Sequence, residues 1–172
     1  RLGLNKRDYG VLTLHRPNNV DEQQSLLSII RTFVAISKTL PIVFPAHPRT
    51  KGNIDQFEFD EFGGSQIYCI EPLGYTDFIK LEMGAKFVAT DSGGIQEETT
   101  VLGVPCLTLR NTTERPITIT QGTNILVSTD AHKITEEVRK ILDGGRKSGT
   151  RPQLWDGRAA ERIIKILAEE NI

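Results

Sequence analysis

Apolar runs of strand length alternate with amphipathic stretches along the whole chain. Six of these runs are predicted as strands, at residues 9–14, 42–45, 66–70, 87–90, 106–109 and 124–127. Their apolar residues are nearly continuous instead of alternating with polar ones, which is typical of strands that are buried on both faces. We therefore expect a sheet with helices packed against both sides.

The clearest amphipathic stretch covers residues 22–39, where apolar residues recur at spacings of three and four and form one face of a helix. Further helices are predicted at residues 54–62, 75–83, 95–102, 132–142 and 157–170. Asp21 is predicted to form a capping box with Gln24 at the start of the first helix, and Asp130 and Asp156 are predicted to cap the last two. Strands and helices that alternate with short turns predict an α/β fold, a Rossmann-like doubly wound parallel sheet in three layers.

The composition fits one compact domain over residues 1–172. Hydrophobic residues make up 38% and charged residues 25% of the chain, and the net charge of −1 predicts no nucleic-acid partner. No stretch approaches the roughly 20 apolar residues of a membrane helix, so we expect no membrane partner and a cytoplasmic location. Cys69 and Cys106 lie in predicted strands and are expected to be buried, reduced thiols. The chain begins with Arg1 instead of methionine and runs almost directly into a strand, which suggests a piece of a longer protein.

Polar side chains gather where three of the predicted strands end. His15 and Arg16 follow the first strand, His47 and Arg49 follow the second, and Asp91-Ser92-Gly93-Gly94 follows the fourth. Taken singly, each histidine fits a structural role as well as a functional one, and each arginine fits a solvated loop. In a doubly wound sheet, however, ligands bind outside the carboxyl ends of the strands, so the common position of these clusters favours a binding site.

The Ser-Gly-Gly turn at residues 92–94 opens a predicted helix. Unpaired N–H groups and the helix dipole attract anions there, and glycines let a phosphate approach the backbone. Glu98 lies about 1.7 helical turns beyond Ser92, within reach of the hydroxyls of a ribose whose phosphates rest on the turn. The alternative is a tight strand-to-helix connection in which Glu97 and Glu98 only complement the dipole.

Other segments carry less information. Residues 111–116 follow the fifth strand and either reach the same edge of the sheet or form a polar surface loop, and Trp155 is predicted to anchor the final helix. The sequence has no Gly-rich loop followed by Lys-Ser/Thr, no Gly-x-Gly-x-x-Gly after a strand, and no His/Cys/Asp cluster with metal-ligand spacing. These absences argue against a Walker-type ATPase, a dinucleotide cofactor and a metal site.

Several short motifs follow one another along nearly the whole chain. They are Thr13-Leu14-His15-Arg16, Pro45-Ala46-His47-Pro48, Thr90-Asp91-Ser92-Gly93-Gly94-Ile95-Gln96-Glu97-Glu98, Leu102-Gly103-Val104-Pro105, Thr113-Glu114-Arg115-Pro116, Gly122-Thr123-Asn124 and Asp156-Gly157-Arg158-Ala159-Ala160-Glu161-Arg162-Ile163. In content and order they resemble the motifs of the non-hydrolysing UDP-N-acetylglucosamine 2-epimerases. The third and fifth motifs together are highly specific for that family.

The resemblance implies the C-terminal half of a GT-B-type enzyme, in which two Rossmann-like domains enclose the active site. Members of the family interconvert UDP-GlcNAc and UDP-ManNAc by eliminating UDP to give 2-acetamidoglucal and adding it back to the opposite face. UDP or UDP-GlcNAc is therefore the expected ligand, and a homodimer is expected for the full-length enzyme. The resemblance implies no metal or redox cofactor.

The resemblance also implies roles for individual residues. Those expected to bind UDP are Ser92, Gly93, Gly94, Glu98 and Arg115. The hydroxyl and the two glycine amides would hold the phosphates, Glu98 would hold the ribose, and the guanidinium would lie near the phosphates. His15 matches a catalytic histidine and would stabilise the departing diphosphate.

Two positions depart from the bacterial pattern of this family. That pattern reads His-Arg-x-Glu-Asn at the first junction, where this chain has Asn18 in place of the glutamate, and Pro-x-His-x-Asn at the second, where this chain has Arg49 in place of the asparagine. Some members have a regulatory UDP-GlcNAc site to which the glutamate and the histidine belong. The residues that match such a second site here are Arg16, Asn18 and His47.

The family's acidic residues proposed to move the C2 proton lie in an N-terminal domain that this chain lacks. We therefore expect the chain to bind UDP weakly and not to epimerise a substrate. A UDP-sugar glycosyltransferase or a hydrolysing epimerase on the same fold, and a nucleotide-binding regulatory module without catalysis, are the alternative functions.

Overall fold

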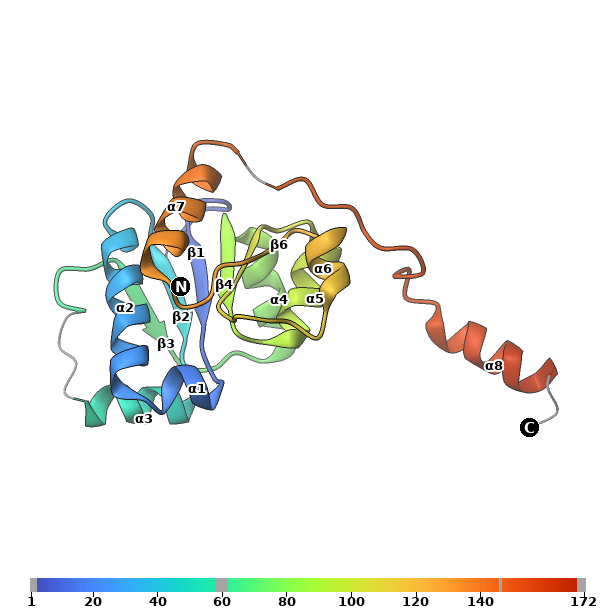
Figure 1. Cartoon of the computed structure of the whole chain (residues 1–172), viewed down its shortest axis with the longest axis horizontal. Coiled ribbons are helices and arrows are strands. Elements are labelled where there is room, and N and C mark those ends of the chain that lie inside the picture. Colours follow the sequence, from blue (N-terminus) through green and yellow to red (C-terminus); the bar gives the residue numbers. More distant parts are fainter. Residues whose placement is uncertain (1–2, 58–61, 146, 170–172) are drawn as a thin grey trace.

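The chain forms six parallel strands and eight helices in a computed structural model that describes residues 3–57, 62–145 and 147–169 (Figure 1). The strands are β1 (Gly10–Thr13), β2 (Ile42–Pro45), β3 (Ile67–Ile70), β4 (Phe87–Thr90), β5 (Cys106–Thr108) and β6 (Asn124–Leu126). The helices are α1 (Pro17–Val20), α2 (Gln23–Ser37), α3 (Pro48–Gln56), α4 (Tyr75–Gly84), α5 (Gly93–Leu102), α6 (Pro116–Thr120), α7 (Ala131–Leu142) and α8 (Ala159–Glu169). The strands lie in the order β3-β2-β1-β4-β5-β6, and every neighbouring pair is parallel.

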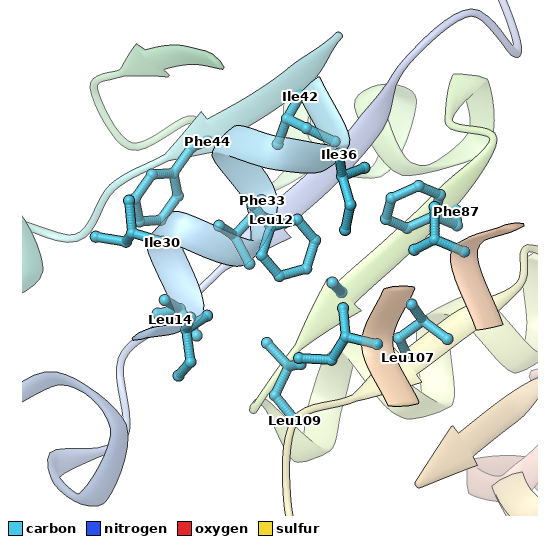
Figure 2. Packing of buried hydrophobic residues seen from close by; sticks show 14 of the residues in the cluster. Leu12, Leu14, Ile30, Phe33, Ile36, Ile42, Phe44, Phe87, Leu107 and Leu109 are labelled. Atoms are coloured by element: carbon cyan, nitrogen blue, oxygen red, sulfur yellow. The ribbon is translucent and has the colours of Figure 1, made fainter. Parts of the chain in front are cut away.

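Two apolar clusters, one on each face of the sheet, make this a three-layer structure. On one face, Leu12 and Leu14 pack with Ile30 and Phe33 of α2 and with apolar residues of α7 (Figure 2). On the other face, the alternate residue Val11 packs with Val43, Val88 and apolar residues of α4 and α5. The predicted Rossmann-like, doubly wound fold is therefore confirmed, because successive strand residues point to opposite faces and both faces are covered.

All six predicted strands are present, each shifted by no more than one residue at either end. The prediction that they are buried on both faces holds for the four interior strands but is wrong for the edge strands β3 and β6, which are only partly buried. Cys69, on β3, is consequently exposed, against our expectation, whereas Cys106, on the interior strand β5, is buried as expected. Burial of a strand depends on its place in the sheet, which its own residues do not reveal.

The helix starting at Pro48 was predicted to start at residue 54. The reason is that Pro48 occupies the first helical turn, where a missing N–H is harmless, and His47 accepts a hydrogen bond from the Arg49 amide at 3.3 Å. Residues 58–61 of the predicted helix lie outside the described residues. The short helices α1 and α6, which also begin at prolines, were not predicted, because they are too short to show an apolar periodicity.

The predicted caps had mixed outcomes. Asp130 does cap α7, accepting from the Lys133 amide at 3.0 Å. The capping box of Asp21 is wrong, because α2 begins after Glu22 without a side-chain cap and Asp21 instead binds the Arg49 guanidinium at 2.5 Å. Asp156 accepts from the Arg158 amide in a turn that precedes α8.

The last helix, α8, follows an extended segment that leads away from the sheet (Figure 1). It begins two residues later than the predicted start at residue 157, and residue 170 of the prediction lies outside the described residues. None of its described residues is buried, and Ile163, Ile164, Ile166 and Leu167 expose their side chains. The expected anchoring by Trp155 therefore does not hold this helix against the sheet. No helix in the described ranges is long and apolar enough to cross a membrane.

Candidate functional site

The site lies at the carboxyl ends of β1 and β4, the two neighbouring strands at the centre of the sheet. From β1 the chain leaves towards β2 on one side, and from β4 it leaves towards β5 on the other. The two connections therefore diverge and leave a crevice between them, which is where doubly wound sheets bind ligands. The ends of the two strands are level, since the hydroxyls of Thr13 and Thr90 are 2.7 Å apart.

Asp91 joins the two connections. Its side chain is fully buried, and one carboxylate oxygen accepts from the Arg16 amide and from the Asn19 side-chain amide, each at 3.0 Å. The other oxygen lies 2.8 Å from Nδ1 of His15. The Arg16 guanidinium in turn donates to the Asp91 carbonyl at 3.0 Å. This network fastens the start of α1 to the start of α5 and sets the position of the imidazole.

The hydrogen bonds around Asp91 shift the pKa values of both Asp91 and His15. Burial acts to raise the pKa of Asp91, but hydrogen bonds from His15, the Arg16 amide and Asn19 outweigh it and lower that pKa. The hydrogen bond to Asp91 is the main cause that raises the pKa of His15. Because Nδ1 faces the carboxylate, Nε2 of this half-exposed imidazole is directed away from Asp91 and is available to a ligand. Asp91 is therefore built to stay ionised and to favour the protonated form of His15.

The first turn of α5 has the features of an anion site. Ser92 precedes the helix, its side chain does not cap the helix, and its hydroxyl makes no hydrogen bond within the described chain. A side chain added at Gly94 would meet only the Ser92 hydroxyl, at 3.9 Å, so the backbone there is open to a ligand. The first N–H groups of a helix have no partner within it and carry the positive end of its dipole. The predicted phosphate turn therefore has an exposed backbone and a free hydroxyl.

The loop after β5 is tied to α5 by polar contacts. The Thr113 hydroxyl donates to Gln96 of α5 at 2.6 Å, and the Gln96 amide donates to the Ser92 carbonyl at 3.0 Å. These contacts bring Arg115 beside the helix, where its Nε lies 2.8 Å from a carboxylate oxygen of Glu97. Arg115 therefore lies, partly exposed, beside the first turns of α5, and its role at the phosphates stays a prediction.

Glu114, in the same loop, lies between two guanidinium groups. Its carboxylate is 3.1 Å from Arg16 and 2.6 Å from Arg110, and the hydrogen bond from Arg110 is the main cause that lowers its pKa to about 2. A side chain added at Gly93 would come within 3.3 Å of this carboxylate. Two cations and one anion thus lie next to the phosphate turn.

Glu98 lies farther along α5 and faces α4. It is half-buried, and burial is the main cause that raises its pKa. A hollow of about 320 Å³ lies near the start of the same pair of helices and is lined by Phe78 of α4, Ile95 of α5, Ser92 and His15. Phe78 and Glu82 are four residues apart and Ile95 and Glu98 are three apart, so each pair lies on one face of its helix. Glu98 therefore lies about one turn beyond Ile95 on the same face of α5, whereas Glu82 is fully buried.

The structure divides the residues predicted for a second site between two hollows. His47 lines the hollow that contains His15 and Ser92. Arg16 and Asn18 line a separate polar hollow of about 340 Å³ together with Arg110. The regulatory site therefore stays a prediction, and in the described part of the chain Arg16 and Asn18 line one hollow and His47 lines another.

Sequence reasoning missed the residues that hold the site together. Asp91 was treated only as part of the turn, and Asn19, Gln96 and Glu114 were given no role. A signal was present for Asp91 and Asn19, because short polar residues at the end of a buried strand or in the following turn commonly bind nearby backbone groups. No local signal marked Gln96, whose partners depend on how α5 packs.

The motifs and this geometry agree with comparisons to known proteins. The model of the family described as UDP-N-acetylglucosamine 2-epimerase matches residues 1–168. The UDP-N-acetylglucosamine 2-epimerase of Methanocaldococcus jannaschii is 42% identical over 164 residues, which are 93% of this chain and 44% of the relative. The UDP-2,3-diacetamido-2,3-dideoxy-D-glucuronate 2-epimerase of Pseudomonas aeruginosa is 36% identical over 171 residues, which are 98% of this chain and 47% of the relative.

A solved structure gives the same result. The crystal structure of the M. jannaschii UDP-GlcNAc 2-epimerase in complex with UDP-GlcNAc and UDP matches with a TM-score of 0.84 and 40% identity, over 95% of this chain and 46% of that one. This chain thus spans less than half the length of the relatives that it matches. It has the fold and the ordered motifs of these enzymes over almost its entire length, and it belongs to the UDP-N-acetylglucosamine 2-epimerase family.

Proposed function

We propose that this chain is the UDP-binding half of a UDP-GlcNAc 2-epimerase that interconverts UDP-GlcNAc and UDP-ManNAc. The observation that carries the proposal is the arrangement at the carboxyl ends of β1 and β4. Ser92 at the open N-terminus of α5 and the imidazole of His15 held by Asp91 border one hollow, and Glu98 lies three residues beyond Ile95, which lines the same hollow. Membership of the family and the UDP-GlcNAc and UDP bound to the M. jannaschii relative support this reading of the site.

In this proposal the diphosphate rests on the first turn of α5. The amides of Gly93 and Gly94 and the Ser92 hydroxyl donate to phosphate oxygens, and Arg115 supplies positive charge beside them. Two turns along the helix, the Glu98 carboxylate accepts from the hydroxyls of the ribose. The hollow beside Phe78 and Ile95 then gives the flat base an apolar surface.

The proposed reaction removes the C2 proton of the sugar and breaks the bond between C1 and the diphosphate oxygen, so that UDP departs with the bonding electrons and 2-acetamidoglucal remains. Re-addition of UDP at C1 and of a proton at the opposite face of C2 completes the epimerisation. His15 is the group of this chain that acts on the leaving diphosphate. Because Asp91 raises the pKa of His15, the imidazole is more readily protonated and stabilises the negative charge that develops on UDP.

The carbon chemistry needs a group that takes up and returns the C2 proton. In our proposal that group belongs to the other half of a two-domain enzyme, and the complete enzyme is a homodimer. The 172-residue chain should therefore bind UDP and leave UDP-GlcNAc unchanged. Incubation of the purified chain with UDP-GlcNAc tests this directly, because formation of UDP-ManNAc would contradict it.

The assignment of Glu98 is tested by calorimetric titration with UDP. Glu98→Ala should lose roughly 1–3 kcal/mol of binding free energy, since it removes a charged hydrogen-bond acceptor. Glu136→Ala is a matched control, because Glu136 is an exposed glutamate on α7, which packs on the other face of the sheet. Equal affinity of Glu98→Ala and the control would disprove the ribose assignment.

The same site fits other reactions of UDP-sugars, and the relative from P. aeruginosa is named for a different UDP-sugar. A protein in which this chain is joined to its other half separates these cases. Our proposal expects UDP-ManNAc from UDP-GlcNAc. Release of free ManNAc would indicate a hydrolysing epimerase, and release of UDP only in the presence of an acceptor would indicate a glycosyltransferase.

A further inference from the structure

Glu114 is a carboxylate beside the proposed phosphate turn, where a negative charge opposes the binding of phosphate. A side chain added at Gly93 would come within 3.3 Å of one of its oxygens, and the Glu114 side chain is 45% exposed. A carboxylate at such close range repels the phosphates of a ligand, and an uncharged residue would avoid that repulsion. The proposed reaction gives this acid no role, so we looked for a part of the ligand that a carboxylate would attract.

Two guanidinium groups orient the Glu114 carboxylate. One oxygen accepts from Arg16 at 3.1 Å, and the other lies 2.6 Å from Arg110, whose side chain is only 13% exposed. Arg16 also donates to the Asp91 carbonyl at 3.0 Å, which ties it to the start of α5. The two cations offset the charge of Glu114 and keep it ionised. Because an ionised carboxylate accepts hydrogen bonds and cannot donate them, Glu114 is an oriented acceptor with an exposed surface.

The loop that carries Glu114 is held against α5 on both sides of this residue. The Thr113 hydroxyl donates to Gln96 at 2.6 Å and accepts from the Arg115 amide at 3.0 Å. Gln96 is fully buried, so this support belongs to the interior of the domain. An acceptor that is held in place before the ligand binds loses little conformational freedom on binding, which favours affinity.

The order of the strands places Glu114 on the side of the phosphate turn that lies away from the base. The hollow proposed for the base is lined in part by residues that follow β1, β2 and β3, namely His15, His47 and Leu73. Glu114 follows β5, and the phosphate turn follows β4, which lies between β1 and β5 in the sheet. In a UDP-sugar the diphosphate separates the uridine from the sugar. If the uridine lies towards β1 and the diphosphate on the turn, the sugar extends towards the loop after β5.

We propose that Glu114 is a sugar-binding residue, whose carboxylate accepts a hydrogen bond from a hydroxyl of the hexose. This inference rests on the proposed function, because it takes the diphosphate to lie on the turn at residues 92–94. Hydroxyl groups are donors that suit a carboxylate, and those at C3, C4 and C6 are the same in UDP-GlcNAc and UDP-ManNAc. A contact with one of them holds the sugar in both directions of the reaction while the configuration at C2 changes.

The experiment compares two ligands of equal charge, UDP-GlcNAc and UDP with a methyl ester on its terminal phosphate. The ester keeps the uridine and the diphosphate but has no sugar hydroxyls. The ratio of the two dissociation constants therefore isolates the contribution of the sugar, because the attraction of the phosphates to the protein cancels. Each ligand is titrated by calorimetry into the 172-residue chain and into Glu114→Gln, whose amide keeps the size of the side chain and loses its charge.

We expect the wild-type chain to prefer UDP-GlcNAc, and Glu114→Gln to lose about tenfold of that preference, as is typical for a hydrogen bond to a charged group. The same variant should bind the methyl ester at least as tightly as the wild type does, because a negative charge beside the phosphates has been removed. An ion pair that only stabilises the loop would not produce this opposite response of the two ligands.

Glu97→Gln is the matched control. Glu97 is a carboxylate of similar exposure, 42%, and it lies 2.8 Å from Arg115 on α5. Its removal changes the charge near the phosphates without removing the proposed sugar contact, so it should change the affinity for both ligands by the same factor. Circular dichroism checks that each variant is folded.

An equal preference for UDP-GlcNAc in the wild type and in Glu114→Gln would overturn the sugar contact. Equal binding of the two ligands by the wild-type chain would overturn it as well, and either result leaves the proposed function standing. Failure of the wild-type chain to bind UDP and its methyl ester would overturn the proposed function and this inference with it.

Discussion

Two regions of this molecule each contain a fully buried acid, and the two acids have opposite properties. At the ends of β1 and β4, Asp91 accepts from the Arg16 amide, Asn19 and His15, and these hydrogen bonds lower its pKa. Between α4 and α5, Glu82 has no such donors, and burial raises its pKa to about 8. Burial alone does not determine the charge of an acid, because hydrogen-bond donors decide whether the ionised form is tolerated. In our proposal Asp91 orients the imidazole of His15 at the phosphates.

The largest effect on stability should come from removing the Asp91 carboxylate at the ends of β1 and β4. Asp91→Ala leaves the donors of His15, Asn19 and the Arg16 amide without their acceptor in a buried position. We expect it to lower the free energy of unfolding by about 3–5 kcal/mol, measured by urea denaturation, because removal of one partner from a buried charged network is among the costliest substitutions.

Asp91→Asn is the milder control, since it keeps the shape and loses the charge. It should lower the pKa of His15, which NMR titration of the imidazole measures, because the hydrogen bond to Asp91 is the main cause of the raised value. An unchanged pKa of His15 in this variant would show that another group sets the imidazole charge.

Glu82 and Asp91 should affect the pH dependence of the free energy of unfolding in opposite directions. The pKa of Glu82 rises from 4.5 to about 8 on folding, so the folded state holds a proton that the unfolded state has lost between these values. Stability should fall with rising pH in this window, by up to about 1.4 kcal/mol per pH unit. Asp91 has the opposite sign: its pKa is lowered on folding, so its contribution is present above pH 3.8 and is lost as the pH falls through its folded pKa.

Unfolding by urea at several pH values checks both signs. Glu82→Gln should make the decline between pH 5 and pH 8 shallower, since the raised pKa of His15 still contributes above pH 6.5, and should leave the acid limb unchanged, since Asp91 is intact. A decline of equal slope in Glu82→Gln would mean that Glu82 does not carry the proton.

The smallest effect concerns the two glycines of the phosphate turn, which lie beside the first region. Neither has a positive φ, so alanine is sterically acceptable to the backbone at both positions. Gly94→Ala meets open space, and Gly93→Ala meets the flexible end of Glu114, so each should change stability by less than about 1 kcal/mol. Both should nevertheless weaken UDP binding, because the added methyl group lies over the amides. Unchanged UDP affinity in both variants would locate the phosphates elsewhere.

Most of the architecture was predictable from local pattern. The six strands, the approximate limits of most long helices and the cap of α7 at Asp130 follow from periodicity and capping chemistry, which depend on neighbouring residues. The predictions that failed were those that depend on distant partners. Asp21 was expected to cap α2 but is engaged by Arg49, and Cys69 is exposed because β3 lies at the edge of the sheet.

The same distinction holds within the site. His15, Ser92 and Glu98 were identified from motifs that directly follow strands or lie on one helix, where the sequence spacing determines the relative positions. Asp91 was read as part of a turn, although its main partners lie 72 to 76 positions away. Such partners meet only because β1 and β4 become neighbours, and the order of strands cannot be read from the strands one at a time.

The sequence by itself therefore determined the α/β class and the family, and it predicted the edge of the sheet for the site and the turn at residues 92–94 for the phosphates. The tertiary structure alone decided that Asp91 connects the two central junctions, that Glu82 is buried without a hydrogen-bond partner in the described chain, and that Arg16 and His47 line different hollows. The physical reason is the separation in sequence of the residues that interact, because periodicity, capping and turn chemistry act between residues a few positions apart. The ionisation of a buried acid depends on every group packed around it, and that set of groups exists only after the helices and strands have assembled.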